Sequence, residues 1–320
     1  MKHIKSYNEF LFEQDNKESD LYKGYVILTD IWDVNWTGKD GAADNFITAI
    51  TDTNIDTINI DPELPILSQN GRILNILLKE GRVKKENVYN LPEATSKSID
   101  KKKFHEFIGE DENIPKTVFS KEDAETLKFP IIAKPGNGHS GVGISVIKSA
   151  DELKDLDSNK YNVYSEFIDK AEEHRFINFN GTPIFWMERK AINDKAKYGD
   201  GGAEEKMMFN YIKRNIDLIP KDYAAINIKF CEKFKDVPYV CFDIMKGTDN
   251  KLYIIESNSS PGADFDITPI VYKNMFEDFY GRDISQEAND VLEKYAKKAV
   301  KRTIDTGAKY NRTYIDNSSK

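Results

Sequence analysis

Two apolar, strand-like runs flank a glycine-rich loop in FPIIAKPGNGHSGVGISVI, residues 129–147. Glycine lets backbone N–H groups approach phosphate oxygens closely, and a lysine at the end of the first run adds a positive charge. Because a strand rather than a helix follows the loop, the segment is neither a P-loop nor a dinucleotide-binding fingerprint. Taken alone, the glycine-rich turn favours a flexible hairpin, and a phosphate-covering loop between two strands is the alternative. The residues concerned are Lys134, Gly136, Gly138, Gly141 and Gly143.

A second segment, YVCFDIMKGTDNKLYIIESN, reads as a β-hairpin that carries oxygen-bearing side chains. Glu256 and Asn258 are two residues apart, so they share one face of the returning strand. Asp243 alternates with apolar neighbours on the first strand, and three oxygen donors therefore converge. Such donors suit a hard ion such as Mg²⁺, which keeps waters and nucleotide phosphates in its shell. An edge hairpin with solvated acids is the alternative for each residue taken alone.

Along the rest of the chain, the pattern predicts a small parallel α/β unit followed by α+β units. In the first unit we expect two strands, residues 25–30 and 56–62, and two helices, residues 41–50 and 72–81.

The later part of the chain predicts longer strands and two further helices. A helix over 98–109, capped by Ser98 or Asp100, precedes the glycine-rich loop. Long strands with an Asn-Gly turn at 180–181 come after the loop. A charged helix is expected over 284–304, followed by a frayed tail.

Composition excludes several classes of function. Lys+Arg 46 against Asp+Glu 54 gives a net charge of −8 and a pI near 5.3, which argues against a broad nucleic-acid-binding surface. Cys231 and Cys241 stand in no metal-binding spacing, so structural zinc and a disulfide framework are not expected. The sequence has no apolar run of membrane-spanning length. We therefore expect a folded cytoplasmic protein without a nucleic-acid or membrane partner.

Taken together and in this order, the glycine-rich loop after a lysine, the strand aspartate and Glu-x-Asn-x-x-Pro-Gly resemble the ATP-grasp superfamily. The resemblance covers roughly residues 20–300 and is closest to the ribosomal-protein glutamate ligases and glutathione synthetases. It implies two α+β subdomains that clamp MgATP, preceded by a small Rossmann-like domain. The implied divisions are a leader (1–20), the Rossmann-like domain (21–98), the small subdomain (99–168), the large subdomain (169–304) and a tail (305–320).

The resemblance also implies roles for individual residues. Lys134 would contact the α- or β-phosphate, and a lysine before the loop would add a further contact, for which Lys101 fits best among Lys101, Lys102 and Lys103. The triphosphate would be covered by Gly138, His139, Ser140, Gly141 and Gly143. The adenine hinge would be Glu166, Phe167 and Ile168. The ribose hydroxyls would bind Glu173. Magnesium or manganese would be held by Asp243, Glu256 and Asn258.

Catalysis in such a site would depend on Arg175 and Arg189, facing the γ-phosphate or the acyl-phosphate oxyanion together with Lys134. The implied reaction is an ADP-forming carboxylate–amine ligation through an acyl phosphate, with small-molecule or peptide substrates. A kinase acting on a hydroxyl group and a non-catalytic nucleotide-binding protein are the alternatives. A homodimer is among the assemblies to be tested.

The N-terminal segment MKHIKSYNEFLFEQ resembles short leaders on some tailed-phage proteins, and Leu11-Phe12-Glu13 looks like a prohead-protease site. A phage origin would follow, with virion association through the leader. An N-terminal helix packed on the first domain is the alternative.

Overall fold

The computed structural model describes residues 23–27, 47–136, 143–191, 209–260, 266–281, 283–284, 286–309 and 313–319. The chain divides into two compact units. The first contains residues up to 95 together with 236–239 and 262–302, and the second contains 96–235, 240–261 and 303–320. The N-terminal leader lies outside the described residues.

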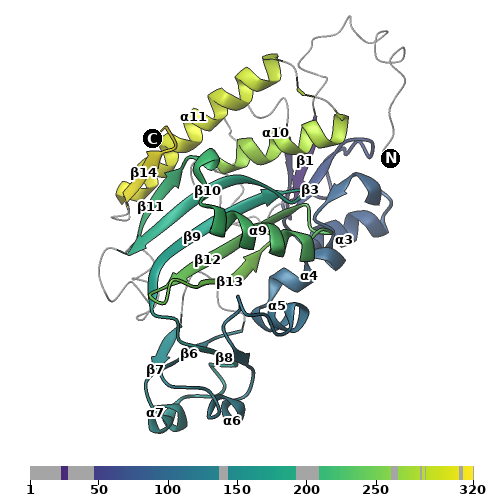
Figure 1. Cartoon of the computed structure of the whole chain (residues 1–320). Coiled ribbons are helices and arrows are strands. Elements are labelled where there is room, and N and C mark those ends of the chain that lie inside the picture. Colours follow the sequence, from purple (N-terminus) through teal and green to yellow (C-terminus); the bar gives the residue numbers. More distant parts are fainter. Residues whose placement is uncertain are drawn as a thin grey trace, which may run out of the picture. The chain divides into compact units, whose positions relative to one another are not determined.

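A four-stranded parallel sheet forms the centre of the first unit (Figure 1). Its strand order is β2-β1-β3-β4, which is the small parallel unit expected from the sequence. The strands are β1 (Gly24–Ile27), β2 (Ile47–Ile50), β3 (Ile66–Ser68) and β4 (Val88–Tyr89). The helices include α3 (Gly71–Lys79), the first part of α4 (Pro92–Ile99), α10 (Ile267–Tyr280) and most of α11 (Gln286–Lys309).

Two sequence expectations for this unit were wrong. The expected helix over 41–50 ends in a strand, because Ile47 and Ile50 are buried and Ile50 packs into the hydrophobic core around β1 and β3. The expected strand over 56–62 is a turn region, in which the Asp61 carboxylate accepts a hydrogen bond from the Glu63 amide. The strand lies further along the chain, at Ile66–Ser68.

The helix after β3 formed as the sequence predicted. The side chain of Asn70 caps α3 by accepting hydrogen bonds from the amides of Arg72 and Ile73. The helix buries its apolar side through Ile73, Leu74 and Leu77.

The second unit contains two sheets. The larger has six strands in the order β13-β12-β9-β10-β11-β14. Its strands are β9 (Lys170–Phe179), β10 (Thr182–Ala191), β11 (Phe209–Arg214), β12 (Tyr239–Gly247), β13 (Leu252–Asn258) and β14 (Thr313–Asn317). Asn180 and Gly181 both have positive φ, so the predicted Asn-Gly turn joins β9 to β10.

The smaller sheet has the order β5-β8-β6-β7, and its strands pair antiparallel. The strands are β5 (Thr117–Val118), β6 (Ile131–Lys134), β7 (Ser145–Ile147) and β8 (Val163–Glu166). Two short helices, α6 (Lys121–Ala124) and α7 (Ala150–Asp155), contribute Ala124 and Leu153 to its hydrophobic core. Helix α5 (Lys101–Ile108) begins after Asp100, whose carboxylate accepts from two helix amides, so Asp100 rather than Ser98 is its cap.

One face of the six-stranded sheet is covered by α9 (Lys221–Lys233) (Figure 1). The buried rings of Tyr223 and Trp186 both lie against Phe176, with ring centroids 6.0 and 5.9 Å from it. Burial of large aromatic rings supplies much of the stabilisation of such a face. Side chains on the other face of these strands are therefore available for a polar site.

The expectation of a frayed C-terminal tail was wrong. Helix α11 continues to Lys309, and Thr313–Asn317 pairs parallel to β11 as an edge strand. The rings of Tyr211 and Tyr314 stack with centroids 5.3 Å apart across this pair. The tail thereby becomes part of the sheet that carries the polar site.

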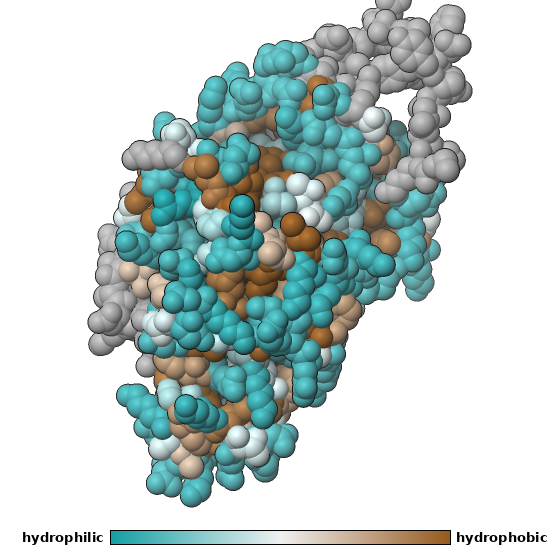
Figure 2. Space-filling view, viewed as in Figure 1, coloured by the Kyte–Doolittle hydropathy of each residue, from teal (hydrophilic) through white to brown (hydrophobic). Residues whose placement is uncertain are grey.

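Figure 2 shows mostly hydrophilic residues on the visible surface, in keeping with the charged composition. Exposed large apolar side chains among the described residues include Phe107, Leu218, Ile228 and Ile304. Within that part of the chain, no helix is long and apolar enough to cross a membrane.

Candidate active site

Strand alternation sorts the side chains of β9 onto two faces. Glu173 and Arg175 point to one face, where they contact Arg189 and Asp243. Glu172 and His174 point to the other, where His174 contacts Trp186. This follows from the period of two along a strand. The charged face with Glu173 and Arg175 is the candidate active site.

Arg175 and Asp243 form a two-pronged ion pair at the centre of this face. Arg175 Nε donates to Asp243 Oδ1 at 2.7 Å, and Nη2 donates to Oδ2 at 2.8 Å. Burial alone would raise the pKa of Asp243, but the Arg175 guanidinium, with help from Arg189, holds it below the usual range. The ion pair therefore favours the ionised form of the aspartate.

Arg189 and Glu173 form a second ion pair beside the first. Arg189 Nη1 donates to Glu173 Oε1, and Lys170 Nζ donates to Glu173 Oε2 at 2.6 Å. Arg189 Nη1 also lies 4.0 Å from Asp243 Oδ2, which links the two pairs. Burial opposes ionisation of Glu173, but Arg189 and Lys170 lower its pKa below the usual value. In this structure both Glu173 oxygens accept hydrogen bonds from cationic side chains.

Sequence reasoning missed Lys170. The lysine and Glu173 are three residues apart, so a regular strand would place them on opposite faces. Lys170 is the first residue of β9, where its side chain bends around to the carboxylate. Strand alternation carried no signal for this contact.

Glu256 lies directly opposite Asp243 in the antiparallel pairing of β12 and β13. Like charges placed opposite each other repel. Withdrawal from water and the charge of Asp243 raise the pKa of Glu256, although Lys101, Arg175 and Lys134 oppose the rise. A cation between the two carboxylates would remove this repulsion.

The donor chemistry here fits a divalent ion. Asp243 and Glu256 supply carboxylate oxygens, and the Asn258 side chain at the end of β13 supplies an amide oxygen that also accepts from the Ser260 amide at 2.8 Å. Each oxygen has more than one lone pair, so the bonds to Arg175 and to Ser260 leave room for a metal. Within the described ranges, no three His, Cys, Asp or Glu side chains gather as a metal site, so the expected set depends on Asn258.

Two lysines lie near this carboxylate pair. Burial lowers the pKa of Lys134, at the end of β6; Glu256 and Glu173 act to raise it, and Lys101 acts to lower it further. Lys101 acts electrostatically on both Lys134 and Glu256, whereas Lys102 pairs with Glu106 on the exposed side of α5. Of the three consecutive lysines, Lys101 is therefore the one whose charge acts on the candidate site.

Residues 72–268, which include all of these charged residues, match a family model described as the RimK-like ATP-grasp domain. That range is well over half of the chain. The chain belongs to the RimK-like ATP-grasp family. The ATP-grasp fold expected from the sequence is thus confirmed.

Relatives of this ATP-grasp chain include D-alanine–D-alanine ligases. The Clostridium perfringens ligase A is 30% identical over 150 residues, covering 44% of this chain and 48% of that protein. The ligase of Staphylococcus saprophyticus is 27% identical over 204 residues, covering 58% of this chain and 52% of that protein. The chain spans about half the length of the curated relatives it matches.

Solved structures show the same fold. The Bacillus anthracis D-alanine–D-alanine ligase superposes with a TM-score of 0.51 at 16% identity, covering 88% of this chain and 99% of that one. The Staphylococcus aureus N5-carboxyaminoimidazole synthetase complexed with ADP gives 0.57 at 12% identity, covering 82% and 78%. The ligase PsnB, complexed with a precursor variant, Mg and ADP, gives 0.51 at 12% identity, covering 87% and 99%.

The expected adenine hinge of this ATP-grasp domain lies at the end of β8. Glu166, Phe167 and Ile168 line a pocket of about 290 Å³, which also touches the β12–β13 turn. Glu166 accepts a hydrogen bond from the Lys116 amide at 3.2 Å. The pocket places the three hinge residues side by side, and their contact with adenine stays a prediction.

Most of the expected phosphate loop lies outside the described residues, including Gly138, His139, Ser140 and Gly141. Gly143 is described and has φ +75°, a left-handed conformation that favours glycine. The backbone conformation at position 143 therefore favours glycine, independently of what the loop binds.

Proposed function

We infer that this chain is an ATP-dependent carboxylate–amine ligase that forms ADP and phosphate through an acyl phosphate. The observation that carries this inference is the pair Asp243 and Glu256, facing each other beside Arg175 and Arg189 on one face of the sheet. Phosphoryl transfer needs little covalent work from the protein and depends on positioned positive charge. Family membership supports the same reading.

Each charged residue has a place in such a reaction. Lys134 would contact the α- or β-phosphate of ATP, and Lys101 would add positive charge beside it. Arg189 would hold the γ-phosphate or the acyl-phosphate oxygens with a planar fork, for which lysine is a poor replacement. Asp243, Glu256 and Asn258 would hold Mg²⁺ or Mn²⁺, which when bound neutralises charge on the β- and γ-phosphates.

Arg175 has two roles in this proposal. It neutralises Asp243 through two hydrogen bonds. A cation on Asp243 would take over part of that neutralisation, so the guanidinium would then be available for phosphoryl oxygens. The neighbouring Glu173 is engaged by Arg189 and Lys170, and binding of ribose hydroxyls to Glu173 would require that these contacts be shared.

The expected substrates are a carboxylate and an amine, each a small molecule or a peptide, in the cytoplasm. Relatives are named D-alanine–D-alanine ligases, which supports a search among amino acids, and the PsnB ligase structure holds a variant of a minimal precursor. A homodimer and virion association stay predictions.

The test is a screen of amino acids and short peptides with the full chain, ATP and Mg²⁺. A ligase releases free phosphate only with the right acid, and hydroxylamine in place of the amine gives a hydroxamate from the acyl phosphate. Mass spectrometry should find the amide product. Phosphate found on the acceptor, with none released, would instead identify a kinase. Binding of MgATP without any turnover across the screen would contradict the ligase assignment.

A further inference from the structure

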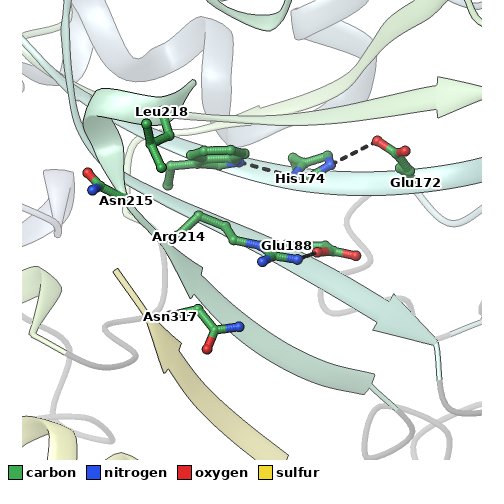
Figure 3. A pocket seen from close by; sticks show the side chains of 8 residues that line it. Glu172, His174, Glu188, Arg214, Asn215, Leu218 and Asn317 are labelled. Carbon is green, nitrogen blue, oxygen red and sulfur yellow. Dashed lines mark hydrogen bonds and ion pairs between the residues drawn. The ribbon is translucent and has the colours of Figure 1, made fainter. Parts of the chain in front are cut away.

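A pocket of about 350 Å³ lies on the opposite face of the six-stranded sheet from the candidate active site. Its lining comes from β9, β10, the end of β11, the 3-10 helix Ile216–Leu218 and β14 (Figure 3). A volume near the lower end of the usual range for ligand sites suits a small molecule. The lining residues are Glu172, His174, Trp186, Glu188, Arg214, Asn215, Leu218 and Asn317.

The two sites are separated by strand alternation. On β10, Arg189 faces Glu173 and Asp243, whereas Glu188 faces Arg214 in the pocket. On β9, Arg175 faces Asp243, whereas His174 faces Trp186. The pocket is therefore outside the ATP chemistry proposed above and has no role assigned by it.

A partly exposed ion pair between Arg214 and Glu188 lies in the pocket. Arg214 Nη2 donates to Glu188 Oε2, with the side chains 35% and 17% exposed. A guanidinium has five N–H donors and a carboxylate two oxygens. Among the described residues, this is the one hydrogen-bonded ion pair that the Arg214 guanidinium and the Glu188 carboxylate make. Both groups therefore keep capacity for a ligand, Figure 3 showing them side by side.

The wall of the pocket is held by a hydrogen-bonded group around His174. Trp186 Nε1–H donates to His174 Nδ1 at 3.0 Å, so the ring proton must be on Nε2, which lies 3.3 Å from Glu172 Oε2. Tyr223 donates to the same Glu172 oxygen at 2.9 Å. Burial lowers the pKa of His174, so the ring is neutral at pH 7. The wall is thus ordered, and its imidazole adds no positive charge.

The charges of the pocket define the class of ligand. Two carboxylates, Glu172 and Glu188, stand against one guanidinium, Arg214. Glu172 is about half-exposed, and its contacts to His174 and Tyr223 both use Oε2, while Asn317 adds an amide to the lining. Leu218 and the Trp186 ring supply apolar surface. An occupant that matches all of this has one carboxylate, two positive groups and an aliphatic stem.

We propose that this pocket binds a basic α-amino acid. Its carboxylate lies on Arg214, its α-ammonium on Glu188, and the cationic end of its side chain near Glu172, with the aliphatic stem along Leu218 and Trp186. Charge-assisted hydrogen bonds of this kind are stronger than neutral ones. The pocket then discriminates by charge, in the order basic, neutral, acidic amino acid.

Trp186 provides the measurement, because it lines the pocket. The chain has three tryptophans, and the other two are Trp32 and Trp36. In a Trp32→Phe, Trp36→Phe background, titration with L-lysine should give a saturable change of fluorescence without ATP. L-alanine should bind more weakly and L-glutamate not at all. 1,5-Diaminopentane, which lacks the carboxylate, should also bind more weakly than L-lysine.

Matched variants test the charges. Arg214→Gln and Glu188→Gln should each weaken L-lysine binding by about tenfold or more in calorimetry. Arg72→Gln is the control, because Arg72 also pairs with a carboxylate, that of Asp52, but on the exposed surface of the other unit. If the Arg214→Gln and Glu188→Gln variants fail to fold, Asn317→Ala gives the second variant, with a smaller loss expected.

Several outcomes would overturn the proposal. These are no saturable L-lysine signal at millimolar concentrations, equal binding of L-glutamate or 1,5-diaminopentane, and unchanged binding in folded Arg214→Gln. None of these measurements uses ATP. A negative result would therefore reject the amino-acid pocket without bearing on the ligase assignment.

Discussion

Asp243 and Glu256 stand directly opposite each other in the β12–β13 pairing, and each shifts the pKa of the other. The pKa of Asp243 is kept low against burial by Arg175, whereas that of Glu256 is raised by withdrawal from water and by the charge of Asp243. Two neighbouring acids with opposite shifts are typical of functional sites. A divalent cation between them would let both ionise, which links the local electrostatics to metal binding.

Glu256→Gln should have opposite effects with and without metal. In EDTA the melting temperature should rise slightly, because the substitution removes the repulsion with Asp243. In substrate turnover, kcat should fall by about 10²–10³-fold, since a charge that holds the metal against phosphate is lost. High Mg²⁺ should partly restore the rate. The control is Glu232→Gln, on the exposed side of α9, which should match wild type in both assays.

MgATP should raise the melting temperature of the wild-type chain, because a ligand that binds the folded state stabilises it by mass action. At a concentration of 100 times Kd the gain is about 2.7 kcal/mol. EDTA should abolish the shift if Asp243, Glu256 and Asn258 hold the metal. An equal shift of melting temperature without any divalent ion would remove the metal role from these residues.

Lys134→Ala should raise the KM for ATP as well as lower kcat, because a phosphate contact acts in the ground state and in the transition state. Lys101→Ala should shift KM in the same direction, since Lys101 acts electrostatically on Lys134 and Glu256. Lys103→Ala is the control, because Lys103 is exposed on α5. Steady-state kinetics at varied ATP would separate these variants, and equal KM values in all three would reject both lysine assignments.

Much of this site could be read from short stretches of sequence. The alternation of Glu256 and Asn258 and the hairpin that returns them toward Asp243 depend on residues within one pair of adjacent strands. The cap at Asp100 and the turn at 180–181 are local in the same way. Local chemistry specifies such elements, although for the cap the sequence left Ser98 and Asp100 open and the structure decided between them.

Other features depend on contacts between distant parts of the chain. Thr313–Asn317 pairs with Asn210–Arg214, about a hundred residues earlier, and nothing local in so short and polar a segment indicates that partner. The assignment of Ile47–Ile50 to a strand likewise depends on its pairing with β1. The ion pair of Arg175 with Asp243 joins β9 to β12, so it too emerges only from the fold.

His105 should make the protein less stable at acid pH. Burial and the nearby Lys134 lower its pKa from 6.5 to about 4, so the unfolded chain binds more protons between these values. Above about pH 6.5 the ring is neutral in both states and does not make stability depend on pH. As the pH falls toward 4, the unfolded chain gains the proton first and the free energy of unfolding decreases. The loss is on the order of 1–3 kcal/mol, since one pKa unit corresponds to about 1.4 kcal/mol.

His105→Gln tests this dependence. The free energy of unfolding of wild type minus that of the variant should become more negative as the pH is lowered from 7 to 4, measured by urea titration at each pH. If the difference in the free energy of unfolding stays the same across that range, His105 does not have to lose a proton when the chain folds. His174 remains in both proteins and has a lowered pKa of its own, so its effect cancels in the comparison.

Deleting residues 310–320 should destabilise the protein, because β14 completes the edge of the six-stranded sheet. The deletion removes the stack of Tyr314 on Tyr211, and an aromatic pair contributes about 0.5–1.5 kcal/mol beyond its buried area. It also removes Asp316, which lies 3.8 Å from Lys213 Nζ. The melting temperature should fall by several degrees, while deletion of residues 318–320 alone should change it little. If both deletions left the melting temperature unchanged, β14 would contribute nothing to the folded state in solution, and the sheet would end at β11.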